Sequence, residues 1–225
     1  MIYAYGICEP ADASPPPPRR GLGGAKLRAL KSDGLAAVYS RHRSLRLRAS
    51  PELVLAHERV VEAIMARGPV LPLRFGTHLE AEEGLAAVLA ERDDELLRAL
   101  RRVRGHVELG LRVIPRPGSR LDAATGERSG RAYLLARAAE HRRADEAARE
   151  LHAPLAELAA ASLLRERPAP PATLVAAYLV EAGLVDEFRA RAGELAARQD
   201  DLHVVVTGPW PPYNFATEEP DAGRD

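Results

Sequence analysis

The sequence predicts an α+β protein that consists of two small two-layer α/β sandwiches. Short apolar runs rich in β-branched residues alternate with longer segments in which apolar residues recur every three or four positions. The pattern restarts at Gly105, so we expect an N-terminal domain at residues 1–104 and a C-terminal domain at residues 105–225. The order of elements in the second half is compatible with a ferredoxin-like βαββαβ layout that lacks one strand.

The N-terminal half should contain three strands and two helical segments. Apolar runs predict strands at residues 2–8, 35–40 and 70–75. Ser50 followed by Pro51 is a typical helix start, and Gly68 ends that helix. An apolar stripe predicts a second helical segment at residues 85–103, broken near Asp93. Residues 9–24 are rich in proline and glycine and should form a surface loop.

The C-terminal half should begin and end with a strand. Alternating or continuous apolar runs predict strands at residues 107–113, 173–180 and 202–206. Residues 130–167 are rich in Ala, Leu, Arg and Glu, which predicts a long helix that Pro154 kinks or splits. A further amphipathic helix is expected at residues 184–195.

A C-terminal extension at residues 208–225 carries a segment rich in proline and aromatic residues. This C-terminal strap, residues 208–215, follows a strand that should end at Val206. Its prolines exclude a helix and a central strand. Two interpretations are open: the strap closes the protein's own core, or it is a polyproline-like strip that binds a partner. The aromatic residues of the strap are Trp210, Tyr213 and Phe215.

Composition excludes several classes of protein. Lys+Arg and Asp+Glu both number 32, so the formal net charge is zero and no global field attracts nucleic acid or an anionic membrane. No apolar run approaches the ~20 residues that a transmembrane helix needs, and the N-terminus lacks the pattern of a signal peptide. One cysteine, Cys8, excludes an internal disulfide and should be a buried small hydrophobe. We therefore expect a soluble cytoplasmic protein.

No motif for catalysis, for a cofactor or for a metal stands out. The chain has no glycine-rich phosphate loop after a strand, no nucleophile elbow and no zinc-protease motif, and its seven histidines are scattered. A single cysteine and the absence of metal-ligand spacing argue against zinc. We expect neither an enzyme nor a bound cofactor. His57, on the apolar face of its helix, should be a core histidine.

One interior segment, residues 70–77, combines unusual features. Pro72 inside an apolar run indicates an edge strand or a bulge, and Gly76 indicates a sharp turn. Arg74 stands between Leu73 and Phe75, so a carboxylate or carbonyl partner is expected near it. Arg74 can bind an anionic ligand, or it can join this segment to the C-terminal strap or to an acid such as Glu58.

Six motifs match a known family, and they lie at residues 3–7, 35–40, 57–62, 70–77, 105–109 and 208–215. Together they resemble the gas vesicle protein F/L family, the accessory proteins GvpF and GvpL. The resemblance covers nearly the whole chain in the expected order. The long loop at residues 9–24 departs from the family pattern and resembles a peripheral insertion.

The resemblance implies two α+β domains and a non-enzymatic role in forming gas vesicles, with the protein in the cytoplasm and at the vesicle. It implies binding to the hydrophobic major shell subunit and to other accessory proteins. Two alternatives remain: an enzyme or small-molecule binder with a site between the domains near Arg74, His57 and Glu58, and a scaffold that recruits a modular domain through residues 15–18. The candidate partner-binding or inter-domain residues are Arg74, Phe75, Trp210, Tyr213 and Phe215.

Overall fold

The computed structural model describes most of the chain in two compact units. Unit 1 comprises residues 1–106 with a C-terminal segment that begins at Trp210, and unit 2 runs from Val107 to Pro209. The predicted domain ranges, 1–104 and 105–225, stay a prediction about independently folding parts. The described residues are 1–13, 19–44, 48–116, 139, 142, 146, 148–165, 172 and 174–217.

The sheet of unit 1 is arranged around its first strand. The strand order is β2-β3-β1-β4, and β5 pairs with the same strand β1. All seven residues of β1 are buried, which confirms it as a central strand. The predicted strands at 2–8 and 35–40 are confirmed, whereas β2 was not predicted because charged residues interrupt its apolar pattern. The strands are β1 (Ile2–Cys8), β2 (Leu27–Ser32), β3 (Leu35–Arg41), β4 (Val70–Pro72) and β5 (His78–Leu79).

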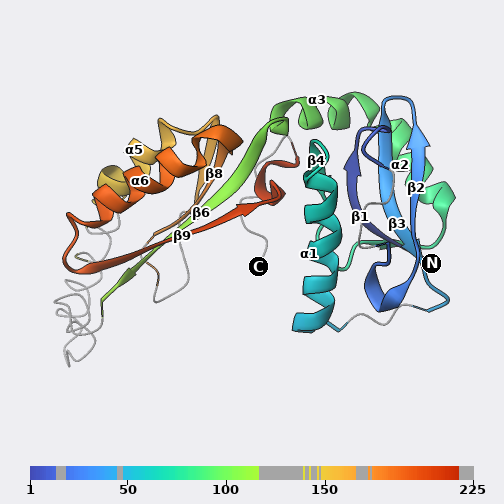
Figure 1. Ribbon diagram of the computed structural model, residues 1–225, viewed down its shortest axis with the longest axis horizontal. Helices are drawn as coiled ribbons and strands as arrows, with labels where there is room; N and C mark the ends of the chain where they lie inside the picture. The colour runs from blue at the N-terminus through green and yellow to red at the C-terminus, as the bar shows by residue number, and fades with distance from the viewer. Residues whose placement is uncertain are drawn as a thin grey trace. The chain divides into compact units, whose positions relative to one another are not determined.

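Helices cover both faces of this sheet. Ser40 of β3 forms a hydrogen bond with Tyr5, which stacks on His57 of α1, while the preceding residue, Tyr39, donates a hydrogen bond to Glu82 of α2. Adjacent strand residues point to opposite faces, so α1 and α2 lie on opposite sides of the sheet (Figure 1). Unit 1 thus has a third layer beyond the predicted two. The helices are α1 (Pro51–Met65), α2 (Glu82–Glu91) and α3 (Asp93–Val103).

Two sequence signals fix the ends of these helices. The Ser50 hydroxyl accepts a hydrogen bond from the Leu53 N–H at 3.4 Å, and Pro51 occupies the first turn of α1. The predicted break near Asp93 is confirmed, because α2 ends at Glu91 and α3 begins at Asp93. Three acidic residues in the first turn of α3 favour a new helix start there.

Unit 2 is a four-stranded sheet with helices on one face. The strand order is β7-β8-β6-β9, and the buried residues of α5 and α6 share one core with alternate residues of β6 and β8. Figure 1 shows these two helices on the same side of the sheet. Its elements are β6 (His106–Pro115), η3 (Ala148–His152), α5 (Ala153–Ala156), β7 (Ala161–Leu164), β8 (Leu174–Glu181), η4 (Ala182–Leu184), α6 (Val185–Ala196) and β9 (Leu202–Trp210).

Two expectations about unit 2 are wrong. Residues 161–164, expected inside a long helix, form strand β7 paired with β8, so no strand of the βαββαβ order is missing. Local composition favours a helix there, but pairing with a neighbouring strand overrides it. Strand β9 continues past Val206 to Trp210, which an edge strand allows despite Pro209. The ferredoxin-like description stays a prediction, and most of residues 117–147 lie outside the described part.

In the described part of the chain, no helix is long and apolar enough to cross a membrane. Cys8 is a free, buried thiol, as expected, and burial raises its pKa to about 12.

A pair of glycine substitutions tests this packing. A Cβ at Gly21 would lie 2.0 Å from the Tyr5 hydroxyl, so Gly21→Ala should lower the free energy of unfolding by about 1–3 kcal/mol. A Cβ at Gly193 of α6 would meet nothing within 4 Å, so Gly193→Ala should raise it by about 0.5–1 kcal/mol. Urea unfolding of both variants measures the two changes. Equal effects of the two substitutions would contradict the packing around Tyr5.

Candidate functional site

The segment after β4 forms a turn along the edge of β1. The Leu73 N–H donates to the Tyr5 carbonyl at 2.9 Å, and the Ala4 N–H donates to the Thr77 carbonyl at 3.0 Å. The Thr77 hydroxyl closes the turn on the Arg74 carbonyl at 2.7 Å. We call residues 73–77 the edge turn. The predicted edge strand and sharp turn are confirmed, because β4 ends the strand order and Gly76 has a φ of 96°.

A buried histidine joins the edge turn to α1 and β1. Nε2 of His57 lies 2.9 Å from the Leu73 carbonyl, which can only accept, so this nitrogen carries the proton. Nδ1 is then an acceptor for the Tyr3 hydroxyl at 2.8 Å. The Tyr3 oxygen in turn accepts the Gly76 N–H at 3.1 Å. His57 is therefore a satisfied, neutral core histidine, as expected.

Burial sets the protonation of this network. It lowers the pKa of His57 to about 4, against the opposing effect of the bond to the Leu73 carbonyl. Burial also raises the pKa of Tyr3 to about 12. Both groups are consequently neutral near pH 7. The rings pack closely, with Tyr3 and Tyr5 centroids 4.9 Å apart and the half-buried Phe75 ring 6.0 Å from His57.

The C-terminal strap is anchored to Glu58, the residue of α1 that follows His57. The Tyr213 hydroxyl donates to Oε1 of Glu58 at 2.9 Å. Phe215 is only 2% exposed, and its carbonyl accepts a hydrogen bond from Arg102 of α3 at 2.8 Å. Burial raises the pKa of Glu58, and burial together with the nearby carboxylate raises that of Tyr213. One turn of α1 thus holds both the edge turn, through His57, and the strap, through Glu58.

The predicted site residues separate into anchors and exposed groups. Tyr213 and Phe215 are anchors, and Phe75 packs on the aromatic cluster. Arg74 is exposed and Trp210 is 44% exposed. Sequence reasoning missed the structural roles of Tyr3 and Arg102, because their partners lie far away along the chain and no local signal marks them.

Leu55 adds an exposed apolar side chain to α1. It is 54% exposed and lies three residues before Glu58. Residues three apart lie on the same side of a helix, so Leu55 shares the side of α1 on which Glu58 holds the strap. Large apolar groups are therefore exposed both on this helix and at the start of the anchored strap.

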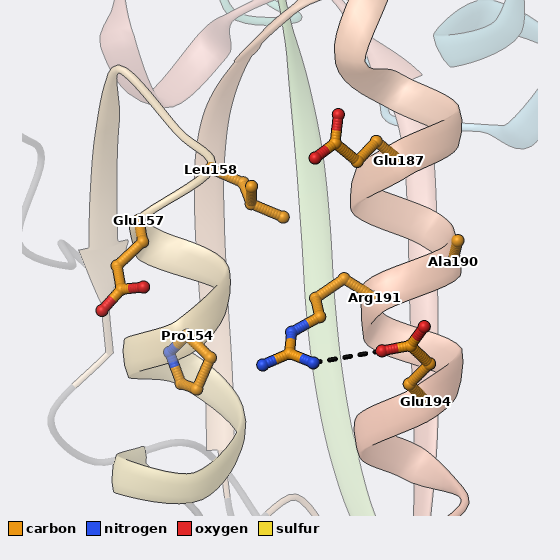
Figure 2. Close-up of a pocket in the computed structure, with 7 residues that line it drawn as sticks. All are labelled: Pro154, Glu157, Leu158, Glu187, Ala190, Arg191 and Glu194. Atoms are coloured by element: carbon orange, nitrogen blue, oxygen red, sulfur yellow. Dashed lines mark hydrogen bonds and ion pairs between the residues drawn. The ribbon is translucent and has the colours of Figure 1, made fainter.

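A groove lies between α5 and α6 in the described part of unit 2. It has a volume of about 300 Å³, and Figure 2 shows acidic side chains along it, with Arg191 bonded to Glu194 at 3.1 Å. Its acidic side chains are all exposed, which differs from the enclosed, mostly apolar pockets that bind small molecules. The lining residues are Pro154, Glu157, Leu158, Glu187, Ala190, Arg191 and Glu194.

Comparison with known proteins decides the family. The family model "Gas vesicle synthesis protein GvpL/GvpF" matches residues 1–217. The chain belongs to the GvpL/GvpF family. It is 31% identical to gas vesicle protein L of Streptomyces sp. (strain CB03234), over 96% of this chain and 92% of that protein. It is 28% identical to gas vesicle protein F2 of Halobacterium salinarum, over 95% of this chain and 91% of that protein.

Solved structures of GvpF share the fold. The crystal structure of GvpF from Anabaena sp. PCC7120 has a TM-score of 0.82 at 20% identity and covers 97% of this chain and 96% of its own. GvpF from Microcystis aeruginosa has a TM-score of 0.79 at 21% identity and covers 96% and 98%. The predicted resemblance and the mixed α/β fold class are confirmed. GvpL/GvpF membership supports a role in gas vesicle formation, and the family is not one of enzymes.

Acid should destabilise the protein through His57. Between pH 6.5 and about 4 the unfolded chain binds a proton that folded His57 does not bind, so the free energy of unfolding falls as pH falls. The full loss is about 3 kcal/mol. His57→Gln keeps a donor but cannot be protonated, so its stability should fall less over the same range. Urea unfolding at several pH values measures both slopes, and equal slopes would exclude His57 as the cause.

Removing the anchors of the strap should cost stability in a defined order. Phe215→Ala should lower the free energy of unfolding by about 3–5 kcal/mol, because the side chain is almost fully buried. Tyr213→Phe should cost about 1 kcal/mol through the lost bond to Glu58. Trp210→Ala, at a half-exposed position, is the control and should cost less than Phe215→Ala. The anchoring is wrong if Trp210→Ala destabilises the protein most.

Proposed function

We propose that this GvpL/GvpF protein is a non-enzymatic assembly factor or minor component of the gas vesicle. It binds the hydrophobic major shell subunit and other accessory proteins in the cytoplasm while the vesicle forms. The observation that carries the proposal is the family match over residues 1–217, which spans both units. A formal net charge of zero fits this role, since no global repulsion opposes association with other proteins.

Arg74 and Trp210 are the proposed contacts with the partner. Each lies exposed on a segment whose neighbours are fixed, Arg74 by the bonds of Leu73 and Gly76 and Trp210 by the anchored strap. Tryptophan and arginine dominate the energetics of many interfaces. Side chains on segments that are already ordered lose less entropy when they bind. In this proposal Phe75 supports the edge turn that carries Arg74, and Tyr213 and Phe215 support the strap that carries Trp210.

A small-molecule site near His57 has less support. Both ring nitrogens of His57 are used inside the protein, and the carboxylate of Glu58 already accepts the Tyr213 hydroxyl. Within the described residues, no group of three His, Cys, Asp or Glu side chains could hold a metal ion. The scaffold alternative rests on residues 15–18, which lie outside the described part of the chain.

Co-expression with the major shell subunit and neighbouring accessory proteins, followed by a pull-down, tests the proposal. We expect the wild-type chain to retain the shell subunit, and Arg74→Ala and Trp210→Ala to retain at least about tenfold less while staying folded, as a loss of about 1.4 kcal/mol would give. Circular dichroism and urea unfolding check the fold of each variant.

Two matched controls sharpen this experiment. Arg59→Ala removes another exposed arginine of unit 1, and Leu164→Ala removes an exposed apolar side chain, 41% exposed, from unit 2. Both should leave retention unchanged. Retention of no gas vesicle protein by the wild-type chain would refute the proposed binding. Equal losses in the controls would place the contact elsewhere.

A further inference from the structure

The two sheets have four edges, and three of them carry a feature that discourages pairing with another strand. Edge strand β2 exposes Arg28 and Lys31. The opposite edge of unit 1 is split into β4, three residues long and ending at Pro72, and β5, two residues long. Strand β7 of unit 2 has four residues. Charge, proline and shortness are the usual means by which proteins protect sheet edges.

Strand β9 is the exception. It is nine residues long, and between Leu202 and Trp210 it contains no Asp, Glu, Lys or Arg, in a chain that is 28% charged. Three consecutive valines at positions 204–206 give it a strong preference for a β-strand. Among the described strands, β6 is the one that pairs with β9, and no other described strand lies along the opposite edge of β9.

The unprotected stretch has a defined length. The Gly208 carbonyl accepts a hydrogen bond from Arg189 of α6 at 2.6 Å, and Pro209 has no N–H to offer. At the other end, the Leu202 carbonyl accepts a hydrogen bond from Arg116 at 3.0 Å. Residues 203–207 lie between these ends, with Val205 at their centre.

Only some of the side chains of this stretch pack into the hydrophobic core of unit 2. Leu202, Val204 and Val206 pack on the core beneath α5 and α6. Since side chains alternate along a strand, Val205 and Thr207 point to the face away from these helices. A substitution at Val205 therefore changes the sheet edge without removing a residue of this core.

We infer that β9 pairs with β9 of a second copy of this chain, antiparallel, about a two-fold axis at Val205. Antiparallel pairing about this axis places Val205 opposite the partner's Val205 and Val204 opposite the partner's Val206, and a strand without Asp, Glu, Lys or Arg meets no like-charge repulsion there. One β9 edge per copy is used, so the assembly closes as a dimer. The inference rests on the sheet edges and not on the proposed function.

Sedimentation of the purified full-length chain over a range of concentrations tests the inference. The wild type should reach twice its 24.4 kDa mass. Val205→Lys and Val205→Glu should each raise the dissociation constant by about tenfold or more, because identical charges then face each other. An equimolar mixture of the two variants should dimerise again, since unlike charges now pair. This rescue is not expected from a substitution that merely unfolds the protein.

Three controls complete the design. Val205→Thr keeps a β-branched, uncharged residue and should dimerise as the wild type does, and Ala190→Lys places the same charge on exposed α6 and should also dimerise. If Val205→Lys does not fold, the double variant His203→Lys with Thr207→Lys replaces it, because both positions are exposed and residue 203 of one copy faces residue 207 of the other. A wild type that stays monomeric, an open series of larger species, or a failed rescue between folded variants would overturn the inference.

Discussion

The hydrogen bonds of His57 are the constraint on which unit 1 depends. A buried imidazole is tolerated only if both ring nitrogens have partners, and here they are the Leu73 carbonyl and the Tyr3 hydroxyl. These bonds join the central strand, α1 and the edge turn over separations of 16 and 54 residues. Because the proton position is fixed by a carbonyl that can only accept, the network has one arrangement, and it specifies how the three elements meet.

The neighbouring residue, Glu58, connects the same helix to the C-terminal strap. Its bond to Tyr213 spans 155 residues of sequence, so the strap returns to the helix that already holds the edge turn. A chain with only 4% aromatic residues gathers several of them here, where each ring buries much apolar area. Unit 1 therefore includes a segment, beginning at Trp210, that lies more than 100 residues after the rest of the unit in the sequence. The exposed Arg74 and Trp210 are held in place by residues that are themselves buried.

Local signals in the sequence predicted those elements that local physics determines. Strand β1, the start of α1 at Ser50 and the break between α2 and α3 follow from apolar period, capping and charge. Strand β7 and the full length of β9 could not be predicted, because a neighbouring strand decides them. Arg74 and Trp210 were predicted as site residues because they interrupt a pattern, and that role stays a prediction. The strap's partner, Glu58, was considered only for Arg74, since a contact across 155 residues leaves no local trace.

The two units differ in what covers the apolar groups that their own helices and strands leave exposed. In unit 1, the strap adds a buried phenylalanine, and its free carbonyl is taken by Arg102. In unit 2, the helices cover one face, and the outer edge of β9 carries the half-buried Val205 and the exposed Thr207 without a charged side chain. An uncharged edge strand can form hydrogen bonds with strands of other chains and so promote aggregation, unless a specific strand already pairs with it. Selection against aggregation would favour a charge at Val205 if the edge stayed free, so an uncharged edge is most easily understood as one that is filled.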